Sequence, residues 1–268
     1  MVTDWTGDSA TVVLVHNQSD HFSVYKQAIS SEVPEPLVVS ELGRVEQAFV
    51  SPDSKWVILQ VWPAVGSGTP DTTFQLMRVP IAGGPPQLIF PMRNGGTAFC
   101  ARPPSNLCAV AEQAADLKTM TVTAFDPVNG RGAELARFGL EVRENMDLFI
   151  DGLLLCDIAP DGTRLAFARS SDGPIEIHSL RGGPTRIISS KGLDHLSSMT
   201  WAADGKSLFV GRRTFDAGEL LHVDMRGETQ SLWKTNGGRC FAKPSPDGSH
   251  VAIFDSQRSA NMWMIENF

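Results

Sequence analysis

The stretch "APDGTRLAF", Ala159–Phe167, decides the fold because close relatives of it recur along the chain. A Pro-Asp-Gly turn followed by an alternating apolar run is typical of a tight corner that leads into a β-strand. Taken alone, the stretch fits either a ligand loop with an exposed carboxylate or a structural hairpin corner. The related stretches are "SPDSKWVIL" (51–59), "AADGKSLFV" (202–210), "SPDGSHVAI" (245–253) and a weaker copy, "TGDSATVVL" (6–14).

The aspartates of these corners measure the period of the repeat. They are Asp8, Asp53, Asp161, Asp204 and Asp247. The first two are 45 residues apart, and the last three are spaced by 43 residues. A further copy, "RPPSNLCAV" (102–110), fills the long gap and has Pro104 at the aspartate position. Six units of about 45 residues match the spacing of β-propeller blades.

Each unit has the same internal order of strands. A short apolar segment ends at the corner, and an alternating strand, a polar loop and a third strand follow. A glycine-bearing corner and a fourth strand close most units, as in "TRLAFAR", "IEIHSL" and "TRIIS" of the fourth unit. The sequence therefore predicts an all-β, six-bladed β-propeller of four-stranded antiparallel blades, without helices.

The blades are expected to form a single domain over 1–268. Their approximate ranges are 1–42, 43–92, 93–140, 141–192, 193–236 and 237–268. The last unit reaches only a third strand, "NMWMIENF" (261–268), so its outer strand is expected to be missing. This shortfall, and a repeat that starts directly at the first residues, predict a fragment of a longer protein.

With these motifs in place, the chain resembles the TolB-type propeller, whose repeat centres on a W-S-P-D-G corner. The resemblance is carried by "VSPDSKWVIL", "IAPDGTRLAF", "TWAADGKSLFV" and "PSPDGSHVAIF". Stretches such as "DWTGDSATVVL" and "LMRVPIAGGPPQLIF" are similar to one subgroup, in which the propeller follows a kinase or winged-helix domain in bacterial signalling proteins. The resemblance implies fold rather than activity, because the shared motifs are structural. It does not fix the compartment, but it favours an extracytoplasmic (periplasmic) location.

Composition and charge exclude several function classes. The chain has 23 Lys+Arg against 30 Asp+Glu, a net charge of −7, and no basic run. This domain is therefore expected not to bind nucleic acid. Since no apolar stretch is long enough to span a bilayer, no membrane insertion is predicted for this chain.

The four cysteines form no C-x-x-C pair, so a zinc site is disfavoured. Cys100 and Cys108 flank a predicted hairpin and either face each other across it or act as small buried hydrophobic residues. The second interpretation is favoured for all four cysteines, with Cys156 and Cys240 on strands.

The corner residues are predicted to be structural. An Asp carboxylate bonds nearby backbone amides and Gly tolerates positive φ, which explains their recurrence without a ligand. The predicted structural set is Asp8, Asp53, Asp161, Gly162, Asp204, Gly205, Asp247 and Gly248. No G-x-S-x-G elbow occurs, and the loop with His16 and His21 fits no standard metal pattern. No catalytic residue, metal or cofactor is predicted.

Binding is expected on the face opposite the corners, where the longer and more varied loops gather. A protein, peptide or small ligand is the expected partner. The candidate binding residues are Arg44, Trp62, Arg93, Asn94, Asp194, His195, Arg213, Phe215 and Arg239.

Two function classes follow from this sequence. The favoured one is a non-catalytic binding or scaffold module of a larger bacterial signalling protein. The alternative is a lactonase- or lyase-like propeller enzyme with a site in its axial channel. The predicted inner strands offer only Glu46 and Asp157 as acids, beside Arg102, Arg239 and Lys243. That is too few carboxylates for a strong cation site, which favours the binding module.

Overall fold

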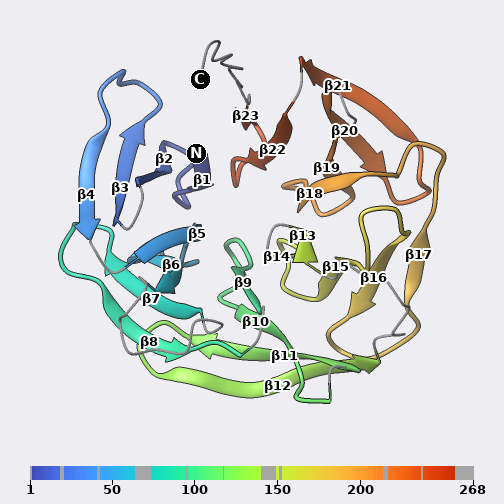
Figure 1. Ribbon diagram of the computed structural model, residues 1–268, viewed down its shortest axis with the longest axis horizontal. Helices are drawn as coiled ribbons and strands as arrows, with labels where there is room; N and C mark the ends of the chain where they lie inside the picture. The colour runs from blue at the N-terminus through green and yellow to red at the C-terminus, as the bar shows by residue number, and fades with distance from the viewer. Residues whose placement is uncertain are drawn as a thin grey trace, which may run out of the picture.

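The computed structural model arranges the chain as a ring of antiparallel sheets around a central axis (Figure 1). It describes residues 2–18, 21–40, 43–63, 74–93, 96–116, 118–139, 149–150, 153–213, 217–236 and 238–256. These residues include no helix, so the described part contains none that is long and apolar enough to cross a membrane. Each sheet is called a blade below, in chain order.

Each of the six sheets is built from strands that are consecutive in the chain. The first contains β1 (Val2–Trp5), β2 (Thr11–Gln18), β3 (His21–Ala28) and β4 (Glu35–Ser40). The second contains β5 (Gly43–Val50), β6 (Trp56–Pro63), β7 (Gln75–Pro80) and β8 (Gln87–Pro91). The third contains β9 (Thr97–Cys100), β10 (Cys108–Gln113), β11 (Thr119–Asp126) and β12 (Gly130–Gly139).

The last three sheets differ in size. The fourth contains β13 (Phe149–Ile150), β14 (Leu153–Ile158), β15 (Arg164–Ala168), β16 (Ile175–Ser179) and β17 (Arg186–Ile188). The fifth contains β18 (Leu196–Trp201), β19 (Ser207–Arg213), β20 (Gly218–Asp224) and β21 (Thr229–Thr235). The sixth contains only β22 (Arg239–Pro244) and β23 (Val251–Ser256) in the described part.

The predicted propeller of antiparallel blades is confirmed, but the predicted six four-stranded blades are not. The described residues form five complete blades and one two-stranded sheet, β22–β23. A corner needs only two strands, so counting corners overestimates the number of complete blades. The predicted third strand at 261–268 lies outside the described residues. The short inner strand β13 was not predicted.

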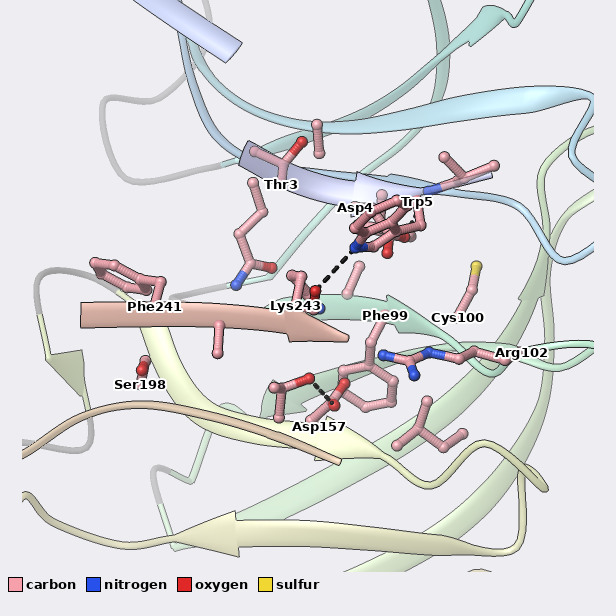
Figure 2. Close-up of a pocket in the computed structure, with 18 of the residues that line it drawn as sticks. Thr3, Asp4, Trp5, Phe99, Cys100, Arg102, Asp157, Ser198, Phe241 and Lys243 are labelled. Carbon is pink, nitrogen blue, oxygen red and sulfur yellow. Dashed lines mark hydrogen bonds between the residues drawn. The ribbon is translucent and has the colours of Figure 1, made fainter. Parts of the chain in front are cut away.

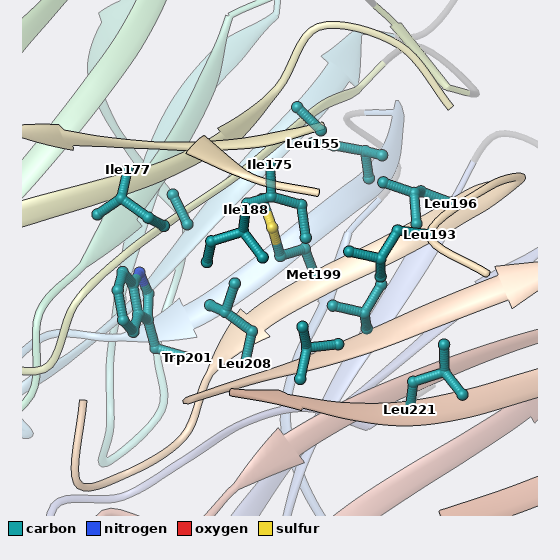
Figure 3. Packing of buried hydrophobic residues seen from close by; sticks show 14 of the residues in the cluster. Leu155, Ile175, Ile177, Ile188, Leu193, Leu196, Met199, Trp201, Leu208 and Leu221 are labelled. Carbon is teal, nitrogen blue, oxygen red and sulfur yellow. The ribbon is translucent and has the colours of Figure 1, made fainter. Parts of the chain in front are cut away.

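The blades pack face to face, so that their middle strands are buried on both sides. Every residue of β10 is buried, and alternate side chains of the strand point to opposite faces. Val110 packs with residues of the second blade, whereas Ala109 packs with residues of the fourth. Figure 3 shows the same arrangement between the fourth and fifth blades, where Ile177, Leu208 and the fully buried Trp201 meet.

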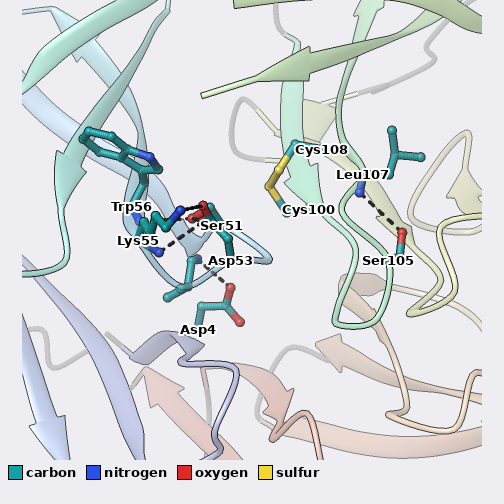
Figure 4. Close-up of a disulfide and its surroundings, with 10 residues drawn as sticks. Asp4, Ser51, Asp53, Lys55, Trp56, Cys100, Ser105, Leu107 and Cys108 are labelled. Carbon is teal, nitrogen blue, oxygen red and sulfur yellow. Dashed lines mark hydrogen bonds and ion pairs between the residues drawn. A yellow bond between two sulfur atoms is a disulfide. The ribbon is translucent and has the colours of Figure 1, made fainter. Parts of the chain in front are cut away.

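The corners share one local geometry. In all five aspartate corners, one carboxylate oxygen accepts the amide of the residue two positions later, at 2.9–3.1 Å. The residue after each aspartate has positive φ; it is Gly162, Gly205 and Gly248 in the later blades but Ser9 and Ser54 in the first two. Figure 4 shows the second corner, around Asp53.

The two serines have a reason to occupy this strained position. The hydroxyl of Ser54 accepts the amide of Gly7 at 3.0 Å, and that of Ser9 accepts the amide of Asp247 at 3.0 Å. Each bond joins a corner to the corner of the neighbouring blade. Each serine side chain makes a hydrogen bond that a glycine could not make. This bond offsets the energetic cost of the left-handed backbone conformation.

A second set of contacts joins the inner strands of neighbouring blades. The indole Nε1 of Trp201 donates to the carbonyl of Asp157 at 3.0 Å, and the Asp157 Oδ2 accepts the Trp201 amide at 2.9 Å. The hydroxyl of Thr200 donates to the same oxygen at 2.8 Å. Asp4 makes the same contact with its carboxylate, since its Oδ2 accepts the amide of Val50 in the next blade at 2.9 Å. We call these contacts inter-blade latches.

The same latch joins the two ends of the described chain. The indole Nε1 of Trp5 in β1 donates to the carbonyl of Lys243 in β22 at 2.8 Å. The Trp5 ring also stacks near His250, with centroids 6.0 Å apart. Within the described residues, side-chain bonds and packing therefore join the first and sixth sheets, without a strand pairing between them.

A disulfide joins Cys100 and Cys108, so the favoured prediction for these two cysteines is wrong (Figure 4). They are paired directly across β9 and β10, with Cα atoms 4.0 Å apart. Cys156 is not part of a disulfide. Burial, with the nearby Asp157 charge, raises the pKa of its thiol well above the ordinary value, so that it stays protonated near neutral pH.

Candidate functional site

A cavity of about 480 Å³ lies on the axis of the ring, where inner strands of all six sheets contribute to its wall, and Figure 2 shows part of that wall. We call it the axial cavity. Its walls come from β1, β5, β9, β14, β18 and β22, together with the starts of several corners. Cavities of this size hold small molecules or short peptide segments.

The period of the inner strands decides which side chains face the axis. In β22, Arg239, Phe241 and Lys243 are partly exposed and line the cavity, whereas Cys240 between them is buried. Alternation along a strand produces this division without any special loop. Most of the axial cavity is thus lined by side chains on regular strands, which hold their positions more rigidly than loop residues do.

The carboxylates of the axial cavity are engaged in the structure. Asp4 and Asp157 belong to the inter-blade latches described above. Glu46 forms an ion pair with Arg44 at 2.6 Å. These acids are spread over three different blades, and the described residues include no cluster of three or more His, Cys, Asp or Glu that could hold a metal ion.

Two cations of the axial cavity have no such partner among the described residues. The Nη1 of Arg102 is buried without a hydrogen-bond acceptor. The Lys243 ammonium forms no ion pair in the described part of the chain, and both side chains line the cavity. Figure 2 shows the Arg102 guanidinium extending from the end of β9 toward the interior.

Of the predicted binding residues that the structure describes, only Arg44 and Arg239 line the axial cavity. Trp62 instead packs edge-to-face on Phe74, with ring centroids 4.6 Å apart. Arg93 lies in a separate shallow hollow and donates its amide to Glu112 at 2.6 Å. Asn94 and Phe215 lie outside the described residues.

The other three predicted residues gather at one loop of the fifth blade. Asp194 pairs with Arg212 at 3.0 Å, and the Arg213 amide donates to the His195 carbonyl at 2.8 Å. The His195 amide in turn donates to Asp172 at 2.9 Å. The predicted set is therefore split among several places rather than assembled in one site.

Sequence reasoning did not include Arg102, Lys243 or the aromatic residues Trp5 and Phe241 among the binding candidates. A signal for Lys243 was present in the repeat. It stands four residues before its corner aspartate, as do Asp4 and Asp157. Aligning the units at this position would have shown that Lys243 replaces the aspartate found in two other units. The inner-strand position therefore carries a positive charge in this unit.

A second hollow, of about 850 Å³, lies between β12 of the third blade and the outer strands of the fourth. Glu176 lies at its wall, held by Arg169 and by His178, whose Nε2 is 2.8 Å from Glu176 Oε2. The His178 ring stacks on Phe138 with centroids 4.2 Å apart. Burial alone would raise the pKa of Glu176, but hydrogen bonds from His178 and Arg169 outweigh it and lower the pKa to about 2.

This network predicts an acid-sensitive part of the fold. A carboxyl whose folded pKa is lowered stabilises the folded state above its unfolded pKa, near 4.3, and loses that contribution as the pH falls toward 2. We expect the Glu176→Gln variant to be less stable than the parent at pH 7 and to converge with it near pH 2 in urea unfolding. The exposed Glu35→Gln serves as control. A stability difference that does not change with pH would contradict this role.

No protein-family model matches the sequence, and no curated protein matches it. Among solved structures, TolB from Acinetobacter baumannii superimposes with a TM-score of 0.65 at 15% identity, covering 89% of this chain and 55% of that chain. A protein assigned as TolB from Agrobacterium tumefaciens gives 0.64 at 17% identity, covering 95% and 90%.

A protein assigned as a 6-phosphogluconolactonase, from Bacteroides uniformis, gives a TM-score of 0.54 at 14% identity, covering 93% of this chain and 76% of that chain. The chain spans about half the length of the A. baumannii TolB. Identities this low establish the fold alone. The chain therefore has a TolB-type β-propeller fold, shared by proteins with different names.

Proposed function

We propose that this TolB-type propeller is a non-catalytic binding module that takes a small ligand or peptide segment in its axial cavity. The observation that carries the proposal is a cavity of about 480 Å³ reached by side chains from all six inner strands. Its acids support binding rather than catalysis, because Asp4, Glu46 and Asp157 already serve structural contacts. A catalytic acid or base needs a reactive oxygen that is available to substrate.

We also propose that the module acts as the sensory or protein-interaction part of a larger bacterial signalling protein. The disulfide between Cys100 and Cys108 supports an extracytoplasmic location for this part, because disulfides persist mainly in oxidising compartments. In the same proposal, 1–268 forms one domain and the β22–β23 sheet is the inner half of a sixth blade. The latch between Trp5 and Lys243 supports this arrangement.

The binding proposal is tested by screening a library of small molecules and short peptides by NMR. A ligand of the axial cavity should lose affinity in Phe241→Ala, whose side chain lines the cavity. It should bind unchanged to Arg213→Ala, which lies at the loop of the fifth blade. Ligands that respond only to Arg213→Ala would move the site to the loops and contradict the proposal.

The enzyme alternative predicts a different result. A propeller lactonase would hydrolyse sugar lactones, and the turnover would depend on a cavity carboxylate. We expect no lactone hydrolysis above background by the parent chain. Hydrolysis that is abolished in Glu46→Gln would overturn the non-catalytic assignment and favour the enzyme.

A further inference from the structure

We propose that Arg102 and Lys243 form an anion subsite in the axial cavity, which binds the carboxylate of an organic acid or of a peptide C-terminus. The inference rests on the proposed function, because it assumes that the ligand enters this cavity. It adds the chemical class of the ligand and the two residues that recognise it.

Arg102 lines the axial cavity and has a buried donor without an acceptor in the described part of the chain. Its guanidinium carries only donor groups, so each buried N–H needs an acceptor from elsewhere. The buried Nη1 has no acceptor among the described residues. A buried donor without a partner destabilises the folded state unless something else supplies the acceptor. The side chain extends into a cavity, where a ligand can supply it (Figure 2).

Lys243 is the second cation, and its place in the repeat explains why its ammonium is available. At the equivalent position, Asp4 and Asp157 use their carboxylates to accept an amide of the next blade. A lysine ammonium cannot accept an amide, so Lys243 keeps only the backbone half of the latch, in which Trp5 bonds its carbonyl as Trp201 bonds that of Asp157. The side chain is thereby left to line the cavity.

The described cavity walls favour a singly charged anion. Four basic residues and three acidic residues line the axial cavity, which leaves one net positive charge. A carboxylate neutralises that excess, whereas a phosphate dianion would add unbalanced negative charge beside Asp4 and Asp157. The planar guanidinium fork matches the two oxygens of a carboxylate. Trp5, Phe99 and Phe241 provide apolar surface for the rest of the ligand.

The test uses 3-phenylpropionate and its neutral counterpart 3-phenylpropionamide as matched probes, measured by calorimetry on the whole chain. Acetyl-Ala-Phe with a free or an amidated C-terminus forms the peptide arm, and inorganic phosphate is the third probe. We expect the carboxylate probes to bind at least tenfold more tightly than their amides and than phosphate. The arm with the higher affinity identifies the source of the carboxylate.

Variants separate recognition from folding. We expect Arg102→Gln to weaken carboxylate binding at least tenfold and Lys243→Met at least threefold, while Arg213→Gln changes nothing. Without ligand, Arg102→Met should melt at or above the temperature of the parent, because a buried donor atom without an acceptor among the described residues has been removed. A purely structural role for Arg102 predicts a lower melting temperature instead, and that result would overturn the subsite.

The remaining outcomes distinguish the two proposals. Carboxylate binding that is lost in Phe241→Ala but unchanged in Arg102→Gln keeps the axial cavity and overturns the anion subsite. Binding that is unchanged in both variants overturns the proposed function as well. Phosphate binding that exceeds carboxylate binding and depends on Arg102 overturns the assignment of the ligand class.

Discussion

Asp157→Ala is expected to lower the free energy of unfolding by about 3 kcal/mol. The Asp157 side chain is buried, and its Oδ2 accepts both the Thr200 hydroxyl and the Trp201 amide of the next blade. Hydrogen bonds to a charged acceptor stabilise by about 1.5–3 kcal/mol each, and truncation also leaves a buried amide without a partner. Urea unfolding followed by tryptophan fluorescence measures the difference.

Asp161→Ala is the matched control, since it removes a carboxylate only four residues away. That side chain is half exposed and bonds Thr163 within its own corner. We expect this variant to lose about 1 kcal/mol, the ordinary net worth of such a bond. Equal losses in the two variants would show that bonds between blades contribute no more than bonds within a corner.

Gly211→Ala is expected to destabilise the protein by at least about 3 kcal/mol, the upper end of ordinary overpacking. A Cβ at Gly211 in β19 would lie 2.1 Å from the carbonyl oxygen of Cys240 in β22. It would also lie 2.3 Å from the Ser198 Oγ, which donates to that same carbonyl at 2.8 Å. Backbone of the sixth sheet must move to relieve the contact, so the loss is larger than for a side-chain clash.

Gly139→Ala in β12 is the control, because nothing lies within 4 Å of a Cβ built there. We expect its stability to stay within about 0.5 kcal/mol of the parent. Thermal unfolding of the two variants and the parent provides the comparison. A Gly211→Ala protein as stable as Gly139→Ala would mean that the fifth and sixth sheets are not held at the described distance.

The sequence predicted the propeller because its corners are local. A carboxylate that bonds an amide two residues later, and a positive φ at the residue between them, depend on three consecutive residues and leave a visible pattern. Ser9 and Ser54 at the glycine position show the limit of this reasoning. Their hydroxyls bond a neighbouring corner that is distant in the chain, and no local pattern announces such a partner.

The candidate site was harder to predict because residues of several different repeat units form it together. Arg102 and Lys243 come from the third and sixth sheets and meet the same cavity only after the ring has formed. Sequence reasoning favoured the varied loops, and it therefore placed Arg213 and Asp194 in the site while leaving Arg102 out. The disulfide was not the favoured interpretation for a similar reason, since the exact register of β9 and β10 determines it.

The contact between Trp5 and Lys243 also sets an order of events during synthesis of the chain. The two residues are 238 positions apart, and ribosomes add roughly 5–20 residues per second. The first blade must therefore wait on the order of 10–50 s before the partner of its indole has been made. Until then, the side of the first blade that later contacts the sixth sheet is exposed. Chaperones and other nascent chains can bind to it during this time. The blade that is synthesised first is in this way among the last to be completed.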